Sequence, residues 1–275
     1  MSVNGDAYFP HWSPDGKRLG FYAGQNYEGS PSEYGYGRLV VTDFSQQTQL
    51  QPSIGALGNV SIADDLQWSP DSKQIAFVGF GTSWNIFIID ADGTSLQRFS
   101  DGSYDTYPTW SPDGKQIAFY SERDSQQNWS GAIYVQAVDT SSAKRLTTTI
   151  DRVLRMQWSP NGKMIAFATY SPEDNFSKIY LLQTDGSEPR LIVDNASIGS
   201  FISWSPDNRF LVAQTAQSLV IADMNTDQVV LYYPQRFASL LPLDIATKIA
   251  SVLLVMGAFM LLAGVVITTR TARHL

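Results

Sequence analysis

Short apolar runs recur along the chain, and both faces of each run are largely apolar. They cover residues 18–22, 74–78, 116–120, 164–168 and 210–213. Runs of this length are typical of strands that lie between two neighbouring sheets. A second apolar stretch follows each one, at residues 38–43, 85–90, 132–136, 178–182 and 218–223. The pattern predicts an all-β chain built from repeated antiparallel strand pairs.

The turn that precedes each run is a motif that occurs five times. It starts at Trp12, Trp68, Trp110, Trp158 and Trp204, and its most regular form is Trp-Ser-Pro-Asp-Gly-Lys. Serine and proline suit the first positions of a tight turn, and glycine or asparagine suits a position with positive φ. The tryptophans are 56, 42, 48 and 46 residues apart, within or just beyond the usual length of a four-stranded propeller blade. We therefore expect a β-propeller of about five four-stranded blades.

The middle residue of the apolar run is small in four of the five copies. These residues are Gly20, Ala76, Ala118 and Ala166, whereas the fifth copy has Val212. A small side chain at this position would allow one blade to approach the next closely. We expect the fifth blade to depart from this packing.

The repeated motif resembles the TolB-type, WD-repeat-like β-propeller family, whose signature reads Trp-Ser-Pro-Asp-Gly-Lys-x-Ile-Ala-Phe. The resemblance covers residues 7–234. It implies a propeller fold but leaves function open, since members include translocation-system partners, sensor domains and lid domains of serine peptidases. Such propellers usually have six blades, and residues 2–11 align with residues 100–109, which precede the third motif. The ring is either five-bladed or has a sixth blade that is missing or supplied elsewhere.

A long uncharged stretch lies near the end of the chain, at residues 249–269. Its 21 residues would span about 30 Å as a helix, the thickness of a bilayer core. We expect a single C-terminal transmembrane α-helix. The expected division is a propeller at 1–236, a juxtamembrane linker and helix start at 237–248, the transmembrane helix at 249–269 and a short basic tail at 270–275.

Small residues recur every seven positions within this stretch, at Ala250, Gly257 and Gly264. One interpretation is a face on which another helix packs closely. The other is that small residues are simply common in such helices.

Two features of the sequence give conflicting predictions for the side of the membrane on which the propeller lies. Positive charges on the two sides of the stretch balance, so the positive-inside rule does not decide. The first residues resemble no cleavable signal peptide, which favours a cytoplasmic propeller with a tail anchor unless the true start lies upstream. The family resemblance implies an extracytoplasmic propeller, and we favour that orientation.

Charge and composition exclude some partners and chemistries. The formal net charge is -7, which disfavours nucleic acid as a partner. The chain has no cysteine, so disulfides and thiolate metal sites are excluded. An aromatic content of 12% with 16% charged residues favours strands over long amphipathic helices.

No catalytic, metal or cofactor site is expected. His11 and His274 are the only histidines, and no Gly-x-Ser-x-Gly motif occurs, so a histidine-dependent triad would have to use His11. Carboxylates recur at Asp15, Asp71, Asp113 and Asp207, either as a ring of ligand-binding charges or as caps of the repeated turn. We favour caps, because function usually lies in the copy that differs. Residues 90–93 resemble the start of a calcium loop, but Asp101 stands where such a loop has glutamate.

Loops that depart from the repeat are the expected contact surface. Residues 24–37 form an insertion with Tyr27, Tyr34 and Tyr36, and the corresponding loops of two later blades carry Trp129 and Phe176. Aromatic side chains on glycine-rich loops are typical of recognition surfaces, although plain long loops would look the same.

Two functions fit these features. The first is a non-catalytic accessory or scaffold subunit of a multi-subunit membrane complex, such as an energy-transducing or photosynthetic one. Its partners would be other membrane subunits and the lipid bilayer. The alternative is a membrane-tethered module that recognises a peptide, glycan or envelope protein through the propeller mouth.

Overall fold

The computed structural model describes eleven segments of the chain, at residues 6–24, 37–43, 48–50, 61–62, 66–80, 83–125, 130–171, 176–196, 201–214, 219–226 and 228–232. Within these segments the regular secondary structure consists of β-strands, which confirms the all-β prediction. No helix in the described segments is long and apolar enough to cross a membrane. The expected helix at 249–269 lies outside them.

The strands form five antiparallel meanders in the described residues, called blades 1 to 5 below. Blade 1 consists of β1 (Asp6–Trp12), β2 (Arg18–Gly24), β3 (Gly37–Asp43) and β4 (Thr48–Leu50). Blade 2 consists of β5 (Ser61–Ile62), β6 (Gln67–Trp68), β7 (Gln74–Phe80), β8 (Trp84–Asp90) and β9 (Gln97–Arg98). Blade 3 consists of β10 (Thr106–Trp110), β11 (Gln116–Ser121), β12 (Ser130–Ala137) and β13 (Ala143–Arg145). Blade 4 consists of β14 (Ile150–Trp158), β15 (Met164–Ser171), β16 (Phe176–Gln183) and β17 (Arg190–Ala196), and blade 5 of β18 (Ile202–Trp204), β19 (Phe210–Gln214), β20 (Leu219–Asp223) and β21 (Gln228–Tyr232).

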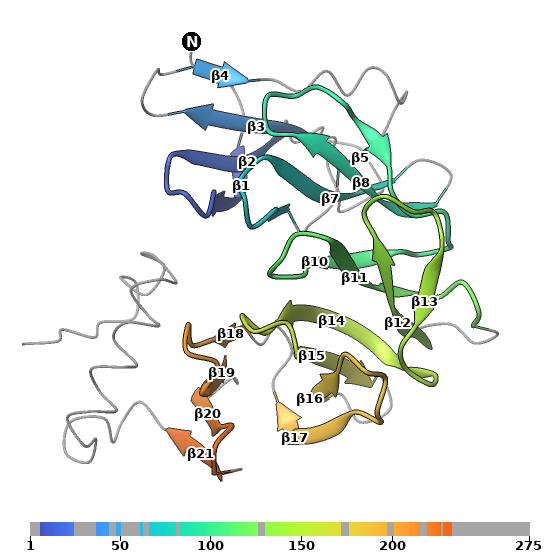
Figure 1. The fold of residues 1–275 in the computed structure, drawn as a ribbon, viewed down its shortest axis with the longest axis vertical. Helices are drawn as coiled ribbons and strands as arrows, with labels where there is room; N and C mark the ends of the chain where they lie inside the picture. Colours follow the sequence, from blue (N-terminus) through green and yellow to red (C-terminus); the bar gives the residue numbers. More distant parts are fainter. Residues whose placement is uncertain are drawn as a thin grey trace, which may run out of the picture.

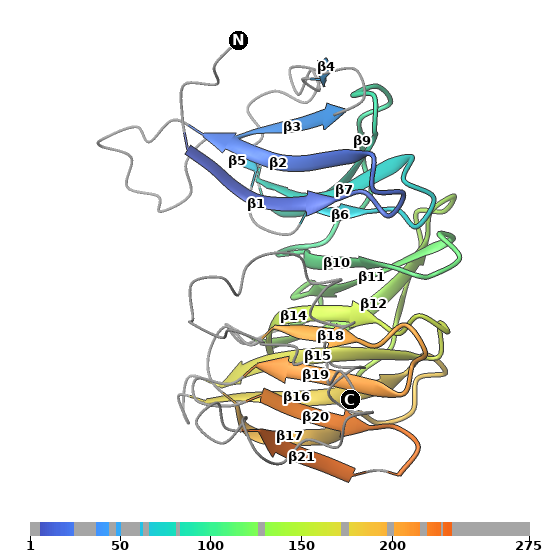
Figure 2. The ribbon, with the colours of Figure 1, turned by 90° about the vertical axis from the view of Figure 1, so that its left-hand side faces the viewer.

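The blades follow one another in chain order around a curved row (Figure 1). Blade 1 lies at one end of the row and blade 5 near the other, and the side view shows the strands of successive blades stacked face to face (Figure 2). In blade 2 both β5 and β6 pair with β7, and β6, which carries Trp68, corresponds to the first strand of the other blades. Contacts join these corresponding first strands, β1 with β6, β6 with β10, β10 with β14 and β14 with β18. These first strands therefore line the inside of the row.

Each repeated turn is held by the same hydrogen bonds. In blade 3 the hydroxyl of Ser111 donates to Asp113 Oδ1 at 2.6 Å, and it accepts the backbone N–H of Gln116 at 2.9 Å. The backbone N–H of Lys115 donates to the same carboxylate oxygen at 3.1 Å. The fourth position of the turn has positive φ in all five copies, at Gly16, Ser72, Gly114, Gly162 and Asn208. The recurring carboxylates therefore act as turn caps, as the repeat indicated.

The repeated tryptophans join one blade to the one before it. The indole N–H of Trp68 donates to the backbone carbonyl of His11 at 3.0 Å, and Trp110 and Trp204 make the corresponding bonds to Gln67 and Gln157. Trp158 differs, since its indole donates to the carbonyl of Gly162 in its own turn.

The small residues of the apolar runs lie beneath these tryptophans. A β-carbon at Gly20 would lie 3.2 Å from Leu66 and 3.3 Å from Trp68 of the next blade. Ala76 shares a buried cluster with Trp110, Ala118 with Trp158, and Ala166 with Trp204. Close approach between blades therefore depends on these small side chains, as expected from the sequence.

Candidate functional site

One position of the repeat varies while its surroundings recur, and it lies three residues before each tryptophan. The residues there are Phe9, Asp65, Tyr107, Arg155 and Phe201. Asp65 falls outside the described part, and the other four lie on or beside β1, β10, β14 and β18. They are called the inner ring below. Because the first strands line the inside of the row, the inner ring is the part of the repeat best placed to contact a ligand at the mouth.

The backbone leaves ordinary strand geometry at two positions of the inner ring. The register between first and second strands shifts across Phe9 in blade 1 and across Tyr107 in blade 3. In blade 4 the shift comes just before Arg155, which itself pairs with Ala168. Phe9 and Tyr107 have φ of 53° and 55°, which is uncommon for aromatic residues. Bulges of this kind re-aim a side chain and are frequent beside binding sites. Phe9 and Phe201 are 42% and 49% exposed, so two aromatic rings of this position reach solvent.

Arg155 of blade 4 lies against blade 5 at the inner ring and acts electrostatically on blade 1. Its guanidinium carbon lies 5.1 Å from the ring centre of Phe201, a cation–π distance. Its charge also acts on His11 of β1. Burial, and after it the positive charge of Arg155, lowers the pKa of His11 from its ordinary value of 6.5. The imidazole is therefore held neutral at physiological pH.

A cluster of polar side chains lies between blades 3 and 4. Arg152 Nη2 donates to the hydroxyl of Tyr104, and the guanidinium carbon lies 5.3 Å from that ring's centre. The hydroxyl of Tyr120 donates to Glu122 Oε1 at 3.4 Å. Burial raises the pKa of Glu122, while the charge of Arg152 opposes this shift. Arginine, tyrosine and a partly buried carboxyl thus converge near the inner strands, a combination suited to binding polar and aromatic groups.

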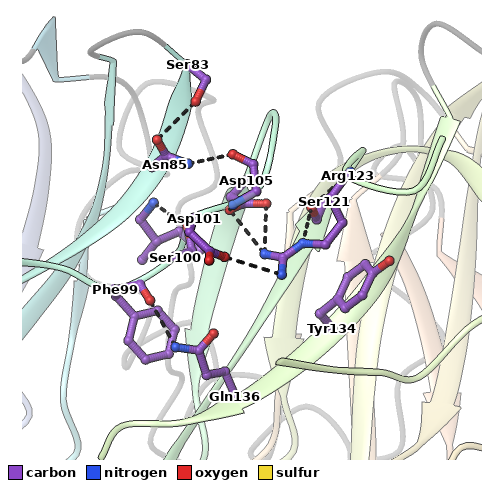
Figure 3. A network of polar contacts seen from close by, with 12 residues as sticks. Ser83, Asn85, Phe99, Ser100, Asp101, Asp105, Ser121, Arg123, Tyr134 and Gln136 are labelled. Atoms are coloured by element: carbon purple, nitrogen blue, oxygen red, sulfur yellow. Dashed lines mark hydrogen bonds and ion pairs between the residues drawn. The ribbon is translucent and has the colours of Figure 1, made fainter. Parts of the chain in front are cut away.

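A polar network braces the junction of blades 2 and 3 (Figure 3). Arg123 pairs with the carboxylates of Asp105 at 3.3 Å and Asp101 at 3.7 Å. Its guanidinium also lies over the ring of Tyr134, 4.9 Å from the ring centre. Asp105 Oδ2 accepts the backbone N–H of Gly102, whose carbonyl accepts from the amide of Asn85. The network joins the two blades and presents no open reactive group, so we interpret it as structural.

The residues expected from sequence to bind partners fall mostly beyond the described segments. Tyr27, Tyr34, Tyr36 and Trp129 lie outside them, as do Ala250, Gly257 and Gly264. Phe176 is the first residue of β16 and pairs with Ser171 of β15. In the sequence, Tyr27, Tyr34, Tyr36 and Trp129 fall between the second and third strands of their blades, and Phe176 begins the third strand of blade 4.

Sequence reasoning missed the inner ring. The available signal was the variation between aromatic, acidic and basic residues at one place in an otherwise regular repeat. Among the described residues, no group of three or more histidine and carboxylate side chains is placed to hold a metal ion.

The meanders, their radial stacking and the recurring tryptophan turn are those of a β-propeller. The model of the TolB β-propeller domain family matches residues 6–228, and the chain belongs to that family. The structure is similar to that of a putative TolB from Agrobacterium tumefaciens, with a TM-score of 0.63, 23% identity and coverage of 82% of this chain and 80% of that one. It is also similar to TolB from Acinetobacter baumannii, with a TM-score of 0.61, 21% identity and coverage of 86% and 56%.

A curated relative is the Dipeptidyl-peptidase 5 of Porphyromonas gingivalis. The alignment extends over 132 residues at 33% identity, and the match covers 43% of this chain and 19% of that protein. The chain thus spans only about a fifth of that relative's length, and the likeness to the two solved structures shows the fold.

Proposed function

We propose that this chain is a non-catalytic, membrane-anchored propeller that serves as an accessory or scaffold subunit of a multi-subunit membrane complex. The observation that carries the proposal is a propeller sequence followed by 21 uncharged residues at 249–269. A helix of that length fits a bilayer. A propeller supplies a rigid, many-sided surface for binding proteins, and the helix would place that surface beside other membrane subunits.

Two surfaces support a binding role, one on the propeller and one on the expected helix. The inner ring offers the exposed rings of Phe9 and Phe201 and the cation of Arg155, residue types enriched where proteins meet. Small residues at Ala250, Gly257 and Gly264 would allow close packing of the helix against a neighbour. We place the propeller on the extracytoplasmic side.

The test is purification of the tagged full chain from its native membrane in mild detergent, followed by size-exclusion chromatography and mass spectrometry. The expected result is a complex with at least one membrane subunit in fixed stoichiometry. Gly257→Leu with Gly264→Leu should release that subunit, whereas Val255→Leu, on the opposite face of the expected helix, should not. Release of the chain from membranes by alkaline carbonate would contradict the anchor, and protease protection in sealed vesicles would test the orientation.

A second function is a tethered module that binds a peptide, glycan or envelope protein at the mouth, and the inner ring favours it. Under this function the purified chain is monomeric, and Arg155→Ala abolishes capture of the ligand while the glycine variants do not. Capture lost only in the glycine variants would contradict it.

A further inference from the structure

The repeated turns of neighbouring blades contact one another, and a cavity lies at one of these junctions. It has a volume of about 320 Å³ and lies between the turns of blades 2 and 3. It is called the turn cavity below. The lining residues that matter here are Pro70, Asp71 and Gln74 of blade 2, and Trp110, Asp113 and Gly114 of blade 3.

The corresponding place between blades 1 and 2 is occupied by two side chains of the chain itself. The hydroxyl of Ser72, in blade 2, accepts the backbone N–H of Asp15, in blade 1, at 3.0 Å. The guanidinium carbon of Arg18 lies 5.3 Å from the ring centre of Trp68, a cation–π distance, and Nη2 of Arg18 donates to the carbonyl of Ser72. A hydroxyl and a guanidinium stacked on the repeated tryptophan thus join these two turns.

Both side chains are replaced at the turn cavity. Gly114 stands where the turn of blade 2 has Ser72, so no side-chain oxygen is offered to the preceding turn. Gln74 stands where blade 1 has Arg18. It is shorter and uncharged, and its amide Nε2 donates to Asp90 Oδ1 at 3.0 Å. The cavity therefore lies where the preceding junction has its hydroxyl and its guanidinium.

The other two junctions between described blades are occupied in different ways. Between blades 4 and 5, Asn208 Oδ1 accepts the backbone N–H of Asn161 at 2.6 Å, which is the role that the Ser72 hydroxyl has between blades 1 and 2. Between blades 3 and 4, the indole of Trp158 donates to the carbonyl of Gly162 at 3.0 Å. That carbonyl corresponds to the one that an arginine binds between blades 1 and 2.

The walls of the turn cavity suit a guanidinium. The indole N–H of Trp110 donates to the carbonyl of Gln67, so it does not take the carbonyl of Gly114 as its counterpart does in blade 4. Hydrogen bonds from the turn serines lower the pKa of the carboxyl groups of Asp71 and Asp113, and both are negatively charged at physiological pH. A guanidinium is planar and always charged, and it can stack on an indole while it donates to carbonyl and carboxylate oxygens.

We propose that the turn cavity is a binding site for an arginine side chain of a partner protein. The guanidinium would stack on Trp110 and donate to the carbonyl of Gly114, close to Asp71 and Asp113. A hydroxyl or amide oxygen beside it in the partner would accept the backbone N–H of Asp71. Free arginine would fit less well, because its own carboxylate would meet two aspartates. The site is separate from the inner ring, and the inference does not depend on the membrane anchor.

The probe for the test is the capped dipeptide N-acetyl-seryl-arginine amide. It is titrated into the full chain, labelled with fluorotryptophan, in detergent micelles, and the Trp110 resonance is assigned with Trp110→Phe. We expect a saturable shift of this resonance. The affinity should be at least about fivefold lower for the lysine analogue and for free arginine, and the uncharged citrulline analogue should give no saturable shift.

Two matched double variants locate the site. Gln74→Arg with Gly114→Ser supplies the cavity with the side chains that occupy the junction of blades 1 and 2. Ser72 has φ of 62° at this position, and a β-carbon at Gly114 would lie 3.7 Å from its nearest neighbour, so serine fits there. This variant should lower the affinity at least about tenfold. Gln116→Arg with Gly162→Ser makes the same change between blades 3 and 4 and should leave the affinity unchanged. Retention of the other tryptophan resonances shows that both variants are folded.

Four results would overturn the proposal. Equal affinities for the arginine and lysine peptides would mean that the cavity responds to charge alone. An equal affinity for free arginine would assign the cavity to a small molecule. A shift that persists in Gln74→Arg with Gly114→Ser would place the binding elsewhere. The absence of a saturable shift at Trp110 would mean that the cavity takes no guanidinium.

Discussion

The guanidinium of Arg123 lies 3.3 Å from the carboxylate of Asp105, a side chain with 0% exposure. Arg123 follows the end of β11, and Asp105 immediately precedes β10. The pair therefore lies where the two ends of the β10–β11 hairpin of blade 3 meet blade 2, and its carboxylate is shielded from solvent. A carboxylate in such a place depends on its partner, because charge without a counter-charge is costly to bury.

Arg123→Met should lower the free energy of unfolding by about 3–5 kcal/mol, since it leaves the charge of Asp105 buried and uncompensated. Adding Asp105→Asn should recover part of this loss, because the charge is then gone. Urea unfolding followed by fluorescence measures both. Lys73→Met is the control, because the pair of Lys73 with Asp71 is largely exposed and should contribute less than about 1 kcal/mol. Equal losses for Arg123→Met and Lys73→Met would contradict the structural role of the network.

Trp68→Phe should destabilise the chain far more than Trp12→Phe. Trp68 is buried, donates to the carbonyl of His11 at 3.0 Å and lies beneath the guanidinium of Arg18 at 5.3 Å. Loss of the hydrogen bond, the contact with Arg18 and part of the buried ring costs about 2–3 kcal/mol. Trp12 is mostly exposed, so its replacement should change the free energy of unfolding by less than about 0.5 kcal/mol. Similar urea midpoints for the two variants would argue that Trp12 is covered in solution.

The sequence predicted the strands and turns because the information that forms them is local. Ser111 and Asp113 specify one turn, and the same pattern recurs in each copy. The turns and the strands that follow them can therefore be predicted from neighbouring residues alone. The inner ring could not be predicted in the same way. Arg155 and Phe201 are 46 residues apart and meet only because neighbouring blades stack. The different settings of Trp12 and Trp68 likewise follow from what precedes each blade, since the two motifs are almost identical.

Ser111→Ala should cost about 1–3 kcal/mol in free energy of unfolding. The buried hydroxyl makes two hydrogen bonds, to Asp113 and from the backbone of Gln116, and both are lost. Ser142 is exposed in the same blade, so Ser142→Ala is the control and should have almost no effect. The Ser111 hydroxyl is the largest cause of the lowered pKa of Asp113. NMR titration of Ser111→Ala should therefore show the pKa of Asp113 returning toward 3.8.

Asp113→Asn should be nearly neutral at physiological pH. The fourth repeat already has Asn161 at this position, where its side-chain oxygen accepts from Ser159 at 2.9 Å and from Lys163 at 3.0 Å. An amide oxygen can thus replace the carboxylate in this turn, because the turn needs an acceptor and not a charge. Thermal unfolding of Asp113→Asn and Asp113→Ala measures the difference. A loss as large for asparagine as for alanine would show that the charge itself holds the turn.

The stability of the propeller should fall as the pH drops below about 6.5, and His11 should account for part of that fall. The pKa of His11 is lower in the folded chain than its ordinary 6.5, because the ring is partly buried and faces the charge of Arg155. The unfolded chain therefore binds a proton at His11 more readily than the folded chain does. The contribution of His11 to the free energy of unfolding is complete above its pKa in the unfolded chain, and it is lost as the pH falls through its pKa in the folded chain. His11→Gln should flatten the dependence of the urea midpoint on pH between about 8 and about 5, and Arg155→Gln should flatten it partly. The contribution of Glu122 to stability depends on pH in the opposite direction, because burial raises the pKa of its carboxyl group. Neither variant alters Glu122. A wild-type slope that persists in His11→Gln would assign the acid sensitivity to other groups.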